Sequence, residues 1–257
     1  MNFTEEQLLD QVALFIWPLM RISAMFVSVP LFSIQAVPAR VRLILAVVIT
    51  LVIMPLLPPL PAVEMFSYAG FMMAITQTMI GLTSGFIVQL VFAAVVFAGQ
   101  AIALSMGLGF SMMVDPQSGQ QVPVIGQLYT VIATLAFISL NGHLLLIQMV
   151  LDSFKTLPIG IDGIDKAGIW SIIVWSGRLF AGGLLLAMPV MASLLLVNVI
   201  FGVAARAAPQ LQIFSVGFPV TLMLGMLLVW KTLPDVLAQF SGMLTDAYDL
   251  IGQLLHL

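Results

Sequence analysis

The chain has 257 residues, of which 61% are apolar and 7% are charged, and its mean hydropathy is +1.17. A soluble domain carries about 25% charged residues, so this composition indicates an integral membrane protein or a subunit embedded in a membrane assembly. The net charge of −3 offers no basic surface, which argues against nucleic-acid binding. The chain has no cysteine, and its two histidines, His143 and His256, are far apart in sequence. We therefore expect no disulfide, no metal site and no cofactor.

The first apolar segment, Val12 to Ile34, is long enough to cross a hydrocarbon core, which needs about 20 helical residues. It contains one charge, Arg21, far from either end, and a charge at that depth is costly in lipid. Three interpretations of Arg21 remain open: a buried structural partner, a role in a transport pathway, and a side chain that snorkels to the membrane surface. The acidic N-terminus lacks the basic region of a secretory signal, so insertion is expected to rely on this segment.

The next segments lead to the centre of the chain. Residues 38–42 contain Arg40 and Arg42 and predict a short basic loop on the cytoplasmic side. The apolar segment Leu43 to Leu57 gives only about 22 Å of helix, which is short for a full span, and prolines follow it. Phe66 to Met106 predicts either two spans or one long, broken helix.

Small residues recur four positions apart in this region, a spacing that lets two helix backbones approach closely. They are Gly81 and Gly85, and then Gly99, Ala103 and Gly107. Three glutamines are candidates for polar contacts within the same region: Gln77, Gln89 and Gln100.

The stretch around residue 110 is the strongest candidate for a functional loop. Gly107 and Gly109 interrupt the apolar pattern, and Phe110, Met112 and Met113 follow before a polar loop sequence. Irregular backbone at membrane depth is tolerated only where it is buried in protein or lines a cavity, which suggests a pore or gate. Adaptable Met side chains suit a seal. Two interpretations remain open for the three side chains: a flexible apolar plug and ordinary core packing.

Asp115-Pro116 ends this stretch and initiates a turn. A structural role in the turn and a direct role in gating both remain open for Asp115. The long apolar segments contain no acidic residue, which argues against a proton-coupled transporter.

The following segments, Pro123 to Leu140 and His143 to about Thr156, predict two helices joined by a tight reversal at Asn141-Gly142. The second helix reaches charged residues too early to span a bilayer, so the pair is expected to be a hairpin buried within protein. Asp152 and Lys155 are three positions apart and are expected to pair on one helix face.

The last third of the chain contains two long apolar segments, Ile169 to Ala205 and Pro209 to Trp230, after a polar break. Arg206 lies at the connection between them, where a cation suits the C-terminus of a helix. Thr232 to Leu257 predicts a separate amphipathic helix with an acidic polar face. Anionic lipid would repel that face, so docking on a protein partner is the better interpretation.

The residue pattern does not indicate an enzyme. A serine protease would need a nucleophile and a base within reach, and the only formal candidates are Ser84 and His143. Ser84 has the neighbours of a close-packed helix, and helix capping accounts for His143. Gly107-Leu108-Gly109 lacks the rest of a nucleotide-binding fingerprint and follows no strand.

In these motifs the chain resembles the FliR proteins of the flagellar type III export apparatus, called SctT in virulence injectisomes. The resemblance covers nearly the whole chain, although the tail after Trp230 is less distinctive and Ser111 stands where Ala is usual. The matching motifs are Arg21, Pro30-Leu31-Phe32, Pro38 and Arg42; Gly99-Gln100, Gly107-Leu108-Gly109-Phe110 and Asp115-Pro116; Asn141-Gly142-His143, Ser153-Phe154 and Leu157-Pro158; Ala187-Met188-Pro189-Val190, Arg206-Ala207-Ala208-Pro209-Gln210 and Phe214-Ser215-Val216-Gly217-Phe218-Pro219.

The resemblance implies an all-α, membrane- or assembly-embedded fold of helical hairpins with broken helices and a central plug loop over roughly Met106 to Val122. It implies a single export-gate domain over residues 1–257, with a FliP-like part at about 1–165 and a FliQ-like part at 166–257. The channel would form with FliP and FliQ, and FlhB and FlhA would associate with it. It would lie in the bacterial inner membrane at the flagellar basal body, in contact with lipid. Its substrates would be unfolded rod, hook and filament proteins.

The alternative is a self-contained membrane solute transporter or channel, and a purely structural scaffold is a third class. A transporter should be monodisperse alone in detergent. An export-gate subunit should behave poorly until FliP-like and FliQ-like chains are co-expressed. A scaffold predicts that changes in the plug leave ion leak and export untouched.

Overall fold

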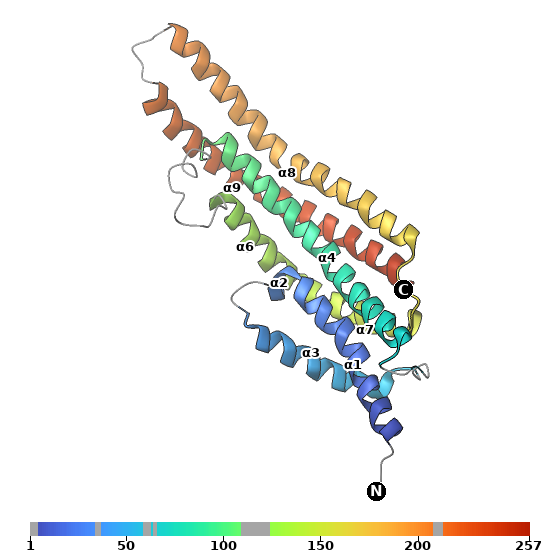
Figure 1. The fold of residues 1–257 in the computed structure, drawn as a ribbon. Helices are drawn as coiled ribbons and strands as arrows, with labels where there is room; N and C mark the ends of the chain where they lie inside the picture. Colours follow the sequence, from blue (N-terminus) through green and yellow to red (C-terminus); the bar gives the residue numbers. More distant parts are fainter. Residues whose placement is uncertain (1–4, 34–36, 59–62, 64–65, 109–123, 208–212) are drawn as a thin grey trace. The chain divides into compact units, whose positions relative to one another are not determined.

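The computed structural model of the chain describes residues 5–33, 37–58, 63, 66–108, 124–207 and 213–257 (Figure 1). No β-strand occurs in these ranges, so the prediction of an all-α fold is confirmed. The helices are α1 (Glu5–Ser28), α2 (Pro30–Ser33), α3 (Ala39–Ile53), the 3-10 helix η1 (Met54–Leu56), α4 (Tyr68–Ser105), α6 (Val124–Ser139), α7 (Gly142–Thr156), α8 (Lys166–Ala207) and α9 (Ile213–Leu255).

Among the described residues, four helical segments are long and apolar enough to cross a membrane. They are Ala39–Leu56, Tyr68–Ser105, Lys166–Arg206 and Gly217–Leu255. Together α6 and α7 qualify as a fifth, broken span with a bend of 60°. The expected membrane protein with a broken helix pair is therefore confirmed.

The bend between α6 and α7 corrects the predicted tight reversal, because the chain turns by 60° at Asn141 and does not fold back on itself. Asn141 has a left-handed backbone with φ of 55°, a conformation that Asn tolerates better than most residues. Its N–H donates to the carbonyl of Ile138 at 3.0 Å, and its carbonyl accepts from the N–H of Leu144 at 3.0 Å. One residue therefore closes α6 and opens α7.

The N-terminal segments differ from the prediction in two ways. The first apolar helix ends at Ser28, and its apolar part, Val12–Ser28, is shorter than a full span. The predicted basic loop is wrong, because Arg40 and Arg42 lie in the first turn of α3. The carbonyl of Pro38 accepts from the N–H of Val41 at 2.9 Å and starts that helix. With this turn and η1 included, the apolar segment that was predicted to be too short for a full span reaches 18 residues, Ala39–Leu56.

Two long helices are continuous where breaks were expected or left open. Within the region from Phe66 to Met106, Tyr68–Ser105 forms one continuous helix, α4. The predicted separate helix at Thr232 is wrong, because α9 runs through Pro234 without interruption. Its C-terminal part is amphipathic as expected. Val236, Phe240, Ala247 and Ile251 are buried, and Asp235, Asp246 and Asp249 are exposed.

Contacts divide the chain into two compact units. Unit 1 comprises residues 1–90, 138–175 and 244–257, and unit 2 comprises 91–137 and 176–243. Each unit draws residues from both sides of position 165, where the division into a FliP-like and a FliQ-like part was predicted. That division remains a prediction, and it coincides with the start of α8 at Lys166.

The core of unit 2 is organised around Phe92 of α4. Its ring packs edge-to-face against Phe137 of α6 at 5.5 Å and against Phe240 of α9 at 5.4 Å between centroids. Such aromatic pairs add about 0.5–1.5 kcal/mol each beyond the apolar area that they bury. One side chain thereby joins three helices.

Candidate functional site

Arg21 occupies the centre of unit 1 and has no exposed surface. Its Nε donates to Oε1 of Gln77 at 2.8 Å, Nη1 donates to Oγ of Ser153 at 2.9 Å, and Nη2 donates to the carbonyl of Leu157 at 2.9 Å. The guanidinium also lies 4.2 Å from the ring centroid of Phe154, in a cation–π contact. Complete burial excludes the snorkelling interpretation.

The Arg21 network connects four segments that are distant in sequence. Gln77 lies on α4, and its Nε2 donates onward to the carbonyl of Gly160 at 3.4 Å. Next to it, the hydroxyl of Thr76 donates to the carbonyl of Ile161 at 3.2 Å. The network therefore joins α1, α4, the end of α7 and the loop that follows α7.

All three hydrogen-bond acceptors of Arg21 are neutral. A buried cation loses hydration that must be compensated by attractive contacts, and breaking such contacts is strongly destabilising. Hydrogen bonds to an ionised group are about twice as strong as neutral ones. The arrangement is suited to holding α1, α4 and α7 in one register, which is the structural role among the three interpretations of Arg21.

Two predicted packing glycines place α1 against α4 beside this network. A Cβ on Gly81 would overlap the backbone oxygen of Arg21, and a Cβ on Gly85 would overlap the hydroxyl oxygen of Ser28. The two helix backbones can approach this closely only because both positions lack a side chain. Gly81 and Gly85 thus bring Gln77, one turn earlier on α4, within reach of the guanidinium.

Gly107, the first predicted residue of the plug, ends α4 in unit 2. Its φ is +82°, a left-handed conformation that glycine adopts without steric cost. The N–H of Leu108 donates to the carbonyl of Ala103 at 3.0 Å, and the N–H of Gly107 donates to the carbonyl of Leu104 at 3.0 Å. These two bonds form a Schellman motif, which satisfies carbonyls at the helix terminus. Gly107 is therefore a helix terminator, a role that the interrupted apolar pattern did not specify.

The end of α4 is held against α9. Met106 is buried, and its side chain fills the space above Gly225, where a Cβ would lie 2.7 Å from the Met106 Cε atom. A Cβ on Gly107 would lie 3.4 Å from the ring of Phe218, which lies about two helical turns before Gly225 on the same face of α9. The backbone that leads out of α4 thus has a defined position within unit 2.

The start of α6 is held equally closely. A Cβ on Gly99 would lie 2.8 Å from the Cα atom of Gly126 and 3.0 Å from the carbonyl oxygen of Ile125. Gly99 therefore allows the first turn of α6 to touch the α4 backbone. On either side of the segment 109–123, Gly107 and Gly126 therefore lie against other helices.

The other predicted site residues have separate positions. Gly109, Phe110, Met112, Met113, Asp115 and Pro116 lie outside the described residues. Ala103 is buried in the last turn of α4, His143 is half-buried in the first turn of α7, and Arg206 is exposed in the last turn of α8. The structure does not bring Arg206 or His143 into the Arg21 network.

Sequence reasoning found only part of the Arg21 network. Gln77 was one of three glutamines suggested for polar contacts, while Gln89 is exposed and Gln100 half-buried. Ser153 and Phe154 appeared only among motifs of the family resemblance. No local signal could have identified the Leu157 carbonyl, because every backbone has such an acceptor.

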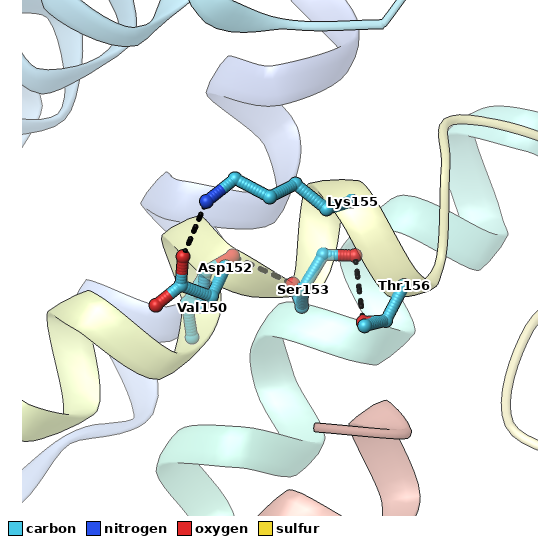
Figure 2. A network of polar contacts seen from close by, with 5 residues as sticks. All are labelled: Val150, Asp152, Ser153, Lys155 and Thr156. Atoms are coloured by element: carbon cyan, nitrogen blue, oxygen red, sulfur yellow. Dashed lines mark hydrogen bonds and ion pairs between the residues drawn. The ribbon is translucent and has the colours of Figure 1, made fainter.

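Asp152 and Lys155 form the expected ion pair on α7, with 2.9 Å between Lys155 Nζ and Asp152 Oδ1 (Figure 2). Figure 2 also shows Ser153 on the same turn, where its hydroxyl donates to the carbonyl of Val150 at 2.6 Å. The Ser153 hydroxyl therefore accepts a hydrogen bond from Arg21 and donates its own hydrogen bond to a carbonyl within α7. In the part of the chain that the structure describes, no three His, Cys, Asp or Glu side chains form a group that could hold a metal ion.

Comparison with known proteins gives a consistent family. A family model described as bacterial export proteins, family 1, matches residues 12–247. The flagellar biosynthetic protein FliR of Escherichia coli (strain K12) is 37% identical over 255 residues, which cover 99% of this chain and 97% of the relative. The protein of the same name from Bacillus subtilis (strain 168) is 33% identical over 217 residues, covering 82% of this chain and 83% of the relative. The chain therefore belongs to family 1 of the bacterial export proteins, the family of the flagellar FliR proteins.

Proposed function

We propose that this chain is a core subunit of the flagellar type III export gate, where it forms the protein-conducting channel together with FliP-like and FliQ-like subunits. The channel passes unfolded rod, hook and filament proteins across the bacterial inner membrane at the flagellar basal body. FlhB-like and FlhA-like components associate with it, and the chain performs no catalysis itself. Family membership and the names of the relatives support this proposal.

The proposal assigns the segment 109–123 to a plug inside the channel. The observation that carries this assignment is the packing of both segment ends in unit 2, at Gly107 and at Gly126. Gly126 touches Gly99, which lies nine residues before Leu108 on α4, or about 14 Å of helix. A fully extended chain as long as the segment 109–123 could span about 50 Å. The segment is therefore much longer than the connection needs, and long loops in compact proteins are usually functional.

In this mechanism Phe110, Met112 and Met113 fill the closed pore, and an apolar constriction resists wetting and ion flow. A passing substrate displaces the loop, which returns afterwards. The Schellman motif at Gly107 keeps the loop attached to the rigid end of α4, so its displacement does not require α4 to unwind.

Replacing residues 109–121 with a short Gly-Ser linker tests the plug, because the helix terminator at Gly107 stays intact. The account predicts a higher ion leak across the inner membrane of cells that carry the assembled gate. A variant that closes as tightly as the natural chain, at equal abundance, would contradict the plug.

The proposal also divides the chain into a FliP-like part, 1–165, and a FliQ-like part, 166–257. The start of α8 at Lys166 and the two long apolar helices that follow support this boundary. The two parts should be separable into two co-expressed chains that still assemble. Failure of such split chains to assemble, when the intact chain does, would argue against the boundary.

A further inference from the structure

A groove of about 580 Å³ lies between α7 and the last turns of α9, within unit 1. Its α7 wall includes Gln148, Met149 and Asp152, and its α9 wall includes Asp249, Gly252 and Gln253. None of these residues takes part in the Arg21 network or in the predicted plug. The groove is therefore a separate feature of the molecule.

Two hydrogen bonds fix the walls of this groove. The hydroxyl of Tyr248 donates to the carbonyl of Gly142 at 2.8 Å, at the start of α7. The hydroxyl of Thr156 donates to the carbonyl of Leu255 at 2.6 Å, at the end of α7. Since α7 and α9 are joined at both ends of α7, the groove exists before any partner arrives, which lowers the entropic cost of binding.

Gly252 keeps the groove open. A Cβ at this position would meet only the Cε atom of Met149, at 3.6 Å, which is an ordinary contact. Packing within the chain therefore does not require glycine here, although glycine in a helix interior costs about 0.5–1 kcal/mol relative to alanine. Because packing within this chain does not need a glycine at position 252, the missing side chain leaves room for the backbone of another protein chain.

The charge of the groove selects the kind of partner. Asp249 is exposed and has no ion pair or hydrogen bond with any residue in the described ranges. Asp152 lines the same groove and pairs with Lys155, whose side chain is 74% exposed, so solvent screens this pair. Carboxylates repel anionic lipid and attract Lys or Arg, and a groove between two helices with a glycine floor fits a third helix.

We propose that this α7–α9 groove binds a basic helical segment of another protein in the export assembly. A Lys or Arg of that segment pairs with Asp249, and its backbone passes over Gly252. Gln148 and Gln253 supply hydrogen bonds at the groove edges. The inference rests on the proposed function only in requiring that the chain assembles with other proteins.

A photo-crosslinking amino acid placed at Gln148, and separately at Gln253, tests the inference in the full chain inside cells. The same substitution at Gln127, an exposed glutamine of α6, is the matched control. The groove positions should crosslink to one peptide that carries Lys or Arg, and the control should not. Crosslinks to lipid, to an exported protein, to a second copy of this chain or to an acidic peptide would overturn the proposal.

Two pairs of variants make the test specific to the groove. Gly252→Leu fills the groove and should lower the crosslink yield by about tenfold or more. Gly242→Leu should not, because a Cβ at Gly242 meets nothing within 4 Å and this residue does not line the groove. Asp249→Lys should abolish the crosslink, and Asp246→Lys, an exposed acid on the same helix, should preserve it.

Equal crosslink yields within each pair would overturn the inference. If Gly252→Leu lowers the abundance of the chain, the aspartate pair decides, because both aspartates are exposed. Native mass spectrometry of the natural chain separates this outcome from a failure of the proposed function. A chain that assembles normally but shows no effect of groove variants refutes only the groove, whereas a chain that joins no export subunits refutes the proposed function.

Discussion

Replacing Arg21 with lysine keeps the positive charge but removes the planar fork of the guanidinium. Three different nitrogens of Arg21 reach Gln77, Ser153 and Leu157. The single nitrogen of lysine cannot reach all three acceptors, and it cannot stack in the same way on Phe154. We therefore expect Arg21→Lys to destabilise unit 1 although it conserves the charge.

The expected size follows from the lost hydrogen bonds. A hydrogen bond to a charged group contributes about 1.5–3 kcal/mol, so losing two of the three should cost at least about 3 kcal/mol. For a chain of this size, a change of 1 kcal/mol shifts Tm by about 2–4 °C. Arg21→Lys should therefore lower Tm by roughly 6–12 °C.

Thermal unfolding of the chain in its purified complex with FliP-like and FliQ-like subunits, followed by tryptophan fluorescence, measures this shift. Trp17 lies one turn before Arg21 on α1 and is buried, so it reports on unit 1. Arg178→Lys is the matched control, because Arg178 is exposed on α8 and surface changes usually stay within about 0.5 kcal/mol. If Arg21→Lys lowers Tm no more than Arg178→Lys, the network does not hold unit 1 together.

Three further tests address separate features, each by the change in Tm. Gly81→Ala should cost about 1–3 kcal/mol because its methyl group overlaps the α1 backbone. The control Gly177→Ala, with no described atom within 4 Å of the new Cβ, should stabilise the protein by about 0.5–1 kcal/mol. Equal effects of the two substitutions would disprove the close approach of α1 and α4. Gly107→Ala should cost about 1–2 kcal/mol because of the left-handed backbone, and Gly107→Asn should cost less; a harmless alanine would show that the helix terminator is not needed. Tyr248→Phe should cost about 1 kcal/mol through the lost bond to the Gly142 carbonyl, and an unchanged Tm would mean that this bond does not hold α9 to α7.

Local patterns in the sequence predicted local structure well. The ion pair of Asp152 and Lys155 needs only a spacing of three residues on one helix, and it forms at 2.9 Å. The amphipathic pattern of Thr232 to Leu257 likewise separates buried from exposed positions. These features depend on helical periodicity, which the sequence displays directly.

Features that depend on distant contacts could not be predicted in this way. The partners of Arg21 lie 56, 132 and 136 residues away in sequence, so the position of Arg21 indicated burial but not the acceptors. The sequence predicts a separate helix from Thr232, yet α9 is continuous there and runs through Pro234. Proline is tolerated in long apolar helices where neighbouring groups satisfy the freed carbonyl, and this depends on packing.

Charge patterns misled in one place for a related reason. Arg40 and Arg42 were assigned to a loop because charges usually flank apolar helices, but both belong to the first turn of α3. Since long basic side chains can keep their charges in water while their stems cover a helix, two nearby arginines do not distinguish a loop from the first turn of a helix.

Co-purification of the tagged chain with FliP-like and FliQ-like neighbours from the same genome, followed by native mass spectrometry, tests whether this chain is a subunit of an export gate. We expect a discrete complex that contains one copy of this chain and several copies of the other two. A stable, monodisperse particle made of this chain alone would contradict the export-gate function and favour a self-contained transporter.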